Sequence, residues 1–201
     1  MTLQWWEKTV EYKFVMEVSQ LDKQFLAPLD GNHERAGDAI FSTSNKWVLI
    51  EFKKDSISIS TEKSKFGSNY KKAKDALAPS DSHHHIVYGK PTKEVPSQLE
   101  LYSQTYFFGL GKSHPLNIKE ILSSGINYKE FSDYLNKLVN YKEVAQGGGS
   151  ENLTINNYFL ITGINSDNQL VACISLTEFQ RQFELKLNHG SNLSQDSGRS
   201  F

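Results

Sequence analysis

The stretch DAIFSTSNKWVLIEFKK, residues 38–54, decides how the chain is interpreted. Two apolar runs rich in β-forming residues, 38–42 and 46–54, flank three turn residues, a pattern that predicts a β-hairpin. The second run, WVLIEF, is apolar almost throughout, as is typical of a central strand covered on both faces. We therefore expect an α/β fold in which residues 46–54 form the middle of a mixed sheet.

Two charged residues interrupt this apolar strand. Side chains two residues apart in a strand project from the same face, so Glu51 and Lys53 should lie side by side while Phe52 points away. Charges on a covered face cost free energy unless a metal, a partner or a substrate phosphate compensates them. The simpler interpretation of the pair is an ordinary salt bridge within the sheet.

Asp38 adds a second carboxylate at the start of the first run. If the hairpin brings Asp38 beside Glu51, a hard divalent cation such as Mg²⁺ would relieve the repulsion between the two carboxylates. The cation would lower the pKa of a bound water, and Lys53 would stabilise negative charge on a phosphate. These parts are sufficient for hydrolysis of a phosphodiester bond.

This arrangement resembles the PD-(D/E)XK, or restriction-endonuclease-like, nuclease superfamily. Gly37-Asp38 corresponds to the PD element without its proline, EFK at 51–53 corresponds to (D/E)XK, and 12 residues separate Asp38 from Glu51. The resemblance covers roughly residues 5–89. It implies a restriction-endonuclease-like core with a central mixed sheet flanked by helices, and activity on DNA.

The resemblance also implies roles for single residues. A Mg²⁺ or Mn²⁺ ion would be held by Asp38, Glu51 and the backbone carbonyl of Phe52, and Lys53 would assist catalysis. A helical glutamate would support the site, and we assign this role to Glu11, which borders the apolar stripe of the first helix. The remaining glutamates are ranked after it: Glu7 is the alternative, Glu17 is third, and Glu34 and Glu62 are expected at the surface.

Periodicity outside this stretch predicts the other elements. Residues 3–21 have helical spacing, although 10–18 also alternate as a strand would. A helix is expected over 62–78, a strand over 85–89 and an amphipathic helix over 128–141. Residues 98–110 fit either helix or strand. The last predicted elements are a hairpin formed by 158–163 and 170–176, and a helix from Thr177 to about Leu187.

We predict one domain over residues 1–187, with a C-terminal helix and hairpin extension over about 90–187 and a disordered tail at 188–201. The segment GGGS at 147–150 is expected to be a flexible loop. The single cysteine, Cys173, excludes an internal disulfide, and no signal peptide or membrane-spanning run is apparent, so we expect a cytoplasmic protein.

The net charge of −1 means that binding to nucleic acid would need a local basic surface. Residues 46–74 supply one, with eight lysines against three acidic residues, although a solvated face is the simpler interpretation. The predicted phosphate contacts are Lys54, Lys63, Lys65, Lys71, Lys72 and Lys74.

Several other motifs are set aside. His83, His84 and His85 lack a completing ligand set and are expected at a loop-to-strand edge. The pair Gln98 and Tyr102 matches a motif of RecB-type exonucleases, but 44 residues separate Lys53 from Gln98, which favours a chance match. GLGKS at 109–113 lacks the first glycine of a phosphate-binding loop.

We thus expect a metal-dependent DNA nuclease, by analogy one that acts in bacterial defence or a mobile element. A catalytically inactive subunit that binds nucleic acid or docks a partner is the alternative, and a structural or regulatory accessory protein of a defence cassette is a third. A homodimer could form through the helix over 128–141, or a partner protein could switch the chain on.

Overall fold

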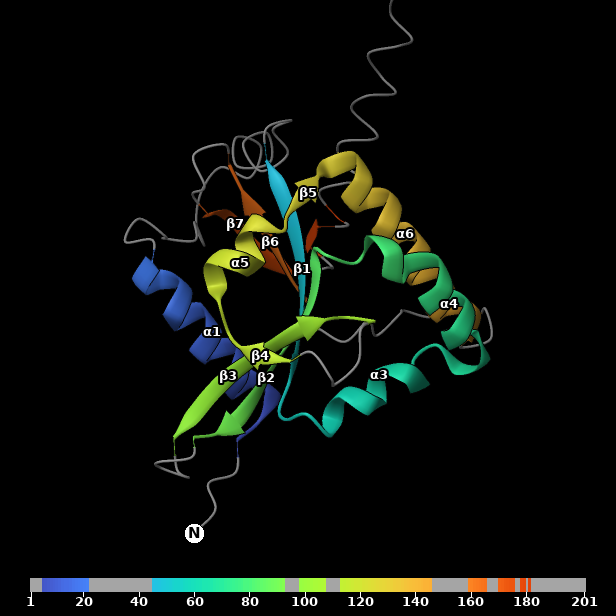
Figure 1. Cartoon of the computed structure of the whole chain (residues 1–201). Coiled ribbons are helices and arrows are strands. Elements are labelled where there is room, and N and C mark those ends of the chain that lie inside the picture. The colour runs from blue at the N-terminus through green and yellow to red at the C-terminus, as the bar shows by residue number, and fades with distance from the viewer. Residues whose placement is uncertain are drawn as a thin grey trace, which may run out of the picture.

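The computed structural model describes residues 5–21, 45–92, 98–107, 113–145, 159–165, 170–175, 178–179 and 181. They form an α/β structure around one mixed, seven-stranded sheet (Figure 1). The strand order is β4-β3-β2-β1-β6-β7, and β5 pairs with β1 beside this path. The predicted α/β class with a central mixed sheet flanked by helices is therefore confirmed.

The strands have the following bounds: β1 Lys46–Lys53, β2 His84–Pro91, β3 Leu99–Thr105, β4 His114–Pro115, β5 Ile126–Asn127, β6 Phe159–Ile164 and β7 Leu170–Ser175. Strand β1 is the centre of the sheet, because it pairs in parallel with β2 and antiparallel with β6. The strands predicted at 46–54 and 85–89 and the C-terminal hairpin are confirmed. Residues 98–110, which fitted either element, include the strand β3.

The helices have the following bounds: α1 Glu7–Leu21, α3 Thr61–Ser64, α4 Tyr70–Leu77, α5 Ile118–Ser123 and α6 Tyr128–Ala145, with 3-10 turns at Ser58–Ser60, Gly67–Asn69 and Ala78–Ser80. Helices α1 and α6 confirm two predictions. The single helix predicted over 62–78 is corrected, because Gly67 adopts a positive φ of 50° and divides it into α3 and α4. The helix predicted from Thr177 falls largely outside the described residues, as do 147–150 and 188–201.

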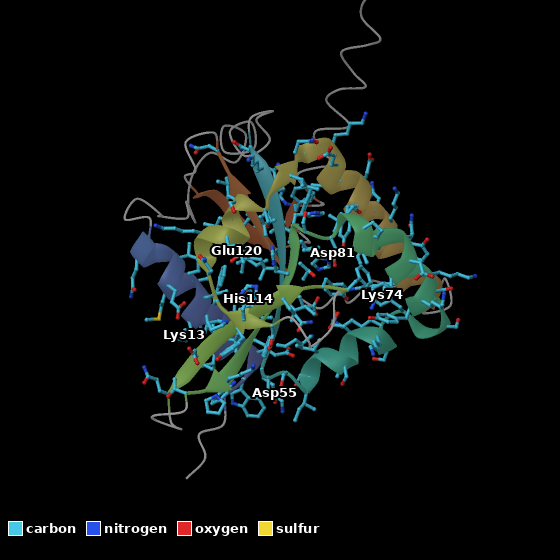
Figure 2. The ribbon with its side chains drawn as sticks, viewed as in Figure 1. Lys13, Asp55, Lys74, Asp81, His114 and Glu120 are labelled. Carbon is cyan, nitrogen blue, oxygen red and sulfur yellow. The ribbon has the colours of Figure 1, made fainter. Side chains whose placement is uncertain are left out.

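Helices cover both faces of the sheet (Figure 1). On one face, Val10, Phe14 and Val18 of α1 pack with Val48, Ile50 and Phe52 of β1, and α5 adds Ile118 and Ile121. On the other face, α4 and α6 pack against Trp47 and Leu49. Figure 2 shows Lys13 on α1 and Lys74 on α4 on opposite sides of the sheet. No described helix is long and apolar enough to cross a membrane.

Candidate active site

The candidate site lies on the face of the sheet covered by α3, α4 and α6. Strand alternation places Trp47, Leu49, Glu51 and Lys53 on this face, and the first two lie in its apolar core. The register of the strands places further side chains on this face. Glu51 pairs with Ile86 of β2, and Ile86 pairs with Gln104 of β3. Glu51 is 0% exposed and Lys53 3% exposed, so two charged side chains lie inside the protein.

Lys53 is the centre of a buried charge cluster. Its Nζ lies 2.9 Å from Glu51 Oε1 and 2.7 Å from Glu62 Oε1. Nζ of Lys65 lies 2.7 Å from the same two oxygens. The salt bridge expected between Glu51 and Lys53 is therefore present, but it is one part of a larger network.

Glu62 enters the network from α3, directly after the turns that follow β1. Its Oε2 accepts a 2.6 Å hydrogen bond from the hydroxyl of Tyr106 and lies 3.8 Å from Nζ of Lys142. Lys142 comes from α6, so the network joins four separate segments: β1, α3, the residue after β3 and α6. Glu62 was expected at the surface; it is buried because it neutralises lysines that would otherwise lie unpaired in the interior.

Electrostatics keep the cluster ionised. Burial alone would raise the pKa of Glu51, but the ammonium groups of Lys142, Lys65 and Lys53 lower it to about 2. Burial would lower the pKa of Lys53, and the carboxylates of Glu51 and Glu62 outweigh that effect and raise it. Glu51 is therefore an anion, and Lys53 a cation, across the neutral pH range.

The helical glutamate that reaches the cluster is Glu7, whose Oε1 lies 3.7 Å from Lys53 Nζ. The indole of Trp5 donates a hydrogen bond to the carbonyl of Lys54, which ties the start of α1 to the end of β1. Glu11 instead pairs with Lys8 at 2.7 Å, and its carboxylate raises the pKa of Cys173 after the larger effect of burial. The assignment of Glu11 stays a prediction, and the contacts favour Glu7.

Asp38 lies outside the described residues, so its distance from Glu51 is not defined. The predicted pairing of 38–42 with β1 is nevertheless corrected. Residues 46–51 of β1 pair with β6 on one side, and the other side pairs with β5 and β2. The C-terminal strand β6 lies at the edge of β1 where the hairpin partner was expected.

The predicted phosphate-binding lysines fall into two groups. Lys54, Lys63, Lys71 and Lys72 are exposed and Lys74 is partly exposed, along the segment from the end of β1 to α4. Figure 2 shows Asp55 near the start of this segment and Lys74 on α4. Lys65 differs, because its side chain is 19% exposed and pairs with the buried carboxylates.

The three adjacent histidines lie where the loop passes into β2, as expected, with His83 in the turn and His84 and His85 in the strand, and all three are buried. His84 stacks on Tyr106 with 3.9 Å between ring centroids, and its Nδ1 lies 2.8 Å from the Tyr134 hydroxyl. Nε2 of His85 lies 2.8 Å from the Ser124 hydroxyl. Burial lowers the pKa of His83 and of His85 to about 4, so both are neutral at pH 7.

Lys142 and Tyr106 were not predicted from the sequence, although each has a sequence feature by which its burial could have been predicted. The buried residues of α6 before Lys142 are Phe131, Tyr134, Leu135 and Leu138, and Lys142 follows four positions later on the same stripe. Tyr106 continues the alternation of Tyr102 and Gln104 along β3. A lysine on an apolar helical stripe indicates a buried charge that requires an anionic partner.

The cluster supplies oxygen donors suited to a hard divalent cation. Oε2 of Glu51 is buried and accepts no hydrogen bond within the described part of the chain, so it could bind such an ion. Across the same described residues, no group of three or more histidine, cysteine or acidic side chains is placed to hold a metal. A surface hollow lined by Lys13, Met16 and Leu116 lies on the α1 side of the sheet and is separate from the cluster.

Comparison of the chain with family models, with curated proteins and with solved structures finds no match in any of the three.

Proposed function

We propose that this chain is a divalent-metal-dependent nuclease that hydrolyses phosphodiester bonds in DNA at the Glu51–Lys53 cluster. The observation that carries the proposal is an ionised, fully buried Glu51 beside Lys53 on one face of the central strand. The chain then crosses over through α3 and α4 to the parallel strand β2. This order of elements agrees with a restriction-endonuclease-like core.

Each residue has a defined task in this proposal. A bound Mg²⁺ or Mn²⁺ would supply a water of lowered pKa and neutralise charge on the phosphate. Glu51 and Asp38 would hold the ion, with the carbonyl of Phe52. Lys53 would stabilise the charge that develops on the phosphate, and Glu7 would orient Lys53.

The exposed lysines from the end of β1 to α4 would bind the DNA backbone through charge, without reading sequence. A specific observation also favours an inactive binding module: the ammonium groups of Lys53 and Lys65 already pair with both Glu51 and Glu62. Such a module would keep the lysine surface and would gain no stability from a divalent cation.

Cleavage of supercoiled plasmid and of single-stranded DNA tests the proposal, with Mg²⁺, Mn²⁺ or a chelator. Wild-type protein should cut only with the metal, and Lys53→Ala should cut at least about 100-fold more slowly, because it removes a charge that stabilises the transition state. Lys46→Ala is the matched control, since Lys46 begins the same strand and is exposed. Asp38→Asn should also abolish cleavage.

Retained cleavage in both Lys53→Ala and Asp38→Asn would exclude this site. Absence of cleavage by the wild-type protein, together with no metal-induced rise in its melting temperature, would favour the inactive binding module.

A further inference from the structure

Two buried carboxylates share the same cations in this structure. Nζ of Lys65 lies 2.7 Å from an oxygen of Glu51 and 2.7 Å from an oxygen of Glu62. A cation that bridges two carboxylates in the interior occupies the position in which a metal ion would be most strongly stabilised. Glu62 follows Glu51 on the next element of the chain, α3, which lies beside the end of β1 (Figure 1).

Buried polar atoms without hydrogen-bond partners among the described residues lie on the same face of the sheet. Gln104 is 3% exposed, and neither its amide oxygen nor its amide nitrogen has a hydrogen-bond partner in the described residues. Its register partner Ile86 pairs in turn with Glu51, so the three side chains project from one face. Two residues further along β3, Tyr106 donates its hydroxyl to Glu62. A buried amide without partners costs free energy unless a ligand or water satisfies it.

The charges of the cluster explain how a metal ion could replace one of its ammonium groups. Three carboxylates, of Glu7, Glu51 and Glu62, face three ammonium groups, of Lys53, Lys65 and Lys142. Lys65 has the most exposed side chain of the three lysines, and its flexible stem can carry the charge outward. Exchange of one ammonium for a divalent cation would add one positive charge, which favours binding of a phosphate.

We propose that Glu51 and Glu62 together bind a divalent cation at the place of the Lys65 ammonium, and that Lys65 moves to the surface when the ion binds. The inference rests on the proposed nuclease function and extends it by naming Glu62 as a ligand and Lys65 as the competing internal cation. Carboxylate and amide oxygens select Mg²⁺ or Mn²⁺ over softer metals. Gln104 projects from the same face of the sheet as Glu51.

Direct titration of Mn²⁺, followed by the electron paramagnetic resonance signal of the free ion, tests this without an activity assay. Six proteins are compared: wild type, Glu51→Gln, Asp38→Asn, Glu62→Gln, Lys65→Met and the control Lys63→Met, whose side chain is exposed on α3. Lys65→Met should bind Mn²⁺ more than about tenfold more tightly, because the competing charge is gone. Glu62→Gln should bind at least about tenfold more weakly, and Lys63→Met should match wild type. Circular dichroism verifies that each variant is folded.

The outcomes separate this inference from the proposed function. Binding that is lost in Glu51→Gln and Asp38→Asn but unchanged in Glu62→Gln and Lys65→Met would overturn the inference and leave the nuclease proposal standing. Absence of Mn²⁺ binding in all variants, Lys65→Met included, would overturn both. Opposite changes in Lys65→Met and Glu62→Gln would support the inference.

Discussion

The two faces of strand β1 differ although they alternate along the same eight residues. Val48, Ile50 and Phe52 enter a largely apolar layer with α1 and α5. On the opposite face, Trp47 and Leu49 are apolar but Glu51 and Lys53 are charged and equally buried. Burial of apolar area stabilises the fold, whereas buried ion pairs are often less stable than apolar residues of similar volume. The charged half of the strand is therefore better explained by function than by stability.

The largest expected effect tests the apolar face of β1. Phe52→Ala should lower the free energy of unfolding by about 3–5 kcal/mol, because it removes a ring that is 1% exposed and packs edge-on against Phe14 at 5.5 Å. Urea unfolding followed by circular dichroism measures it. A loss below about 1 kcal/mol would mean that this layer is loosely packed.

The second largest expected effect tests the charged face of β1. Lys53→Met should lower the free energy of unfolding by about 3 kcal/mol, because it leaves the buried carboxylates of Glu51 and Glu62 with one ammonium fewer. The control Lys46→Met, at the exposed start of the strand, should change it by less than about 0.5 kcal/mol. Equal stability of Lys53→Met and wild type would show that Lys65 and Lys142 are sufficient to compensate the buried carboxylates.

A smaller effect concerns the buried histidines at the start of β2, of which His84 shares the face of Leu49 and His85 the face of Ile50. The folded-state pKa values of His83 and His85 are lowered to about 4 from 6.5, first of all by burial. The unfolded chain therefore binds more protons between these values, so stability is complete above about pH 6.5 and falls as the pH drops towards 4. Between pH 7.5 and 5.5 each of these two histidines should contribute a loss of about 1.3 kcal/mol, and His84, whose pKa burial lowers well below its usual value, adds to it.

Urea unfolding at the two pH values measures this loss, and His85→Gln should reduce it by about a third because one of the three buried imidazoles is removed. Equal stability of the wild-type protein at pH 7.5 and 5.5 would contradict the burial of neutral imidazoles.

Local patterns in the sequence were sufficient for much of the fold. The apolar run of β1 predicted its central place, and period-two alternation placed Glu51 and Lys53 on one face. The partner of β1 could not be predicted in the same way, because adjacent apolar runs favour a hairpin whereas β6, more than 100 residues away in the chain, takes that edge. Choice between distant strands depends on packing of the complete chain, which local propensity does not report.

The site was predicted only in part for a related reason. Glu51 and Lys53 stand out because they are charged residues in an apolar strand. Glu62, Lys65 and Lys142 lie in parts of the sequence that contain many other charged residues, so nothing distinguishes them there. Their burial depends on how α3 and α6 pack over the sheet. Gly67 also decides where α3 ends, and the alternation of β1 contains no information about that turn.

The most direct test of the central claim is DNA cleavage by the double variant Glu51→Leu/Lys53→Met, with its unfolding free energy measured on the same preparation. The variant removes one charge of each sign and keeps the remaining cluster balanced. The account predicts that its stability is at least as high as that of either single variant, and within about 1 kcal/mol of wild type or above it, while metal-dependent cleavage is lost. Cleavage at the wild-type rate would contradict the claim that the charged face of β1 is the active site.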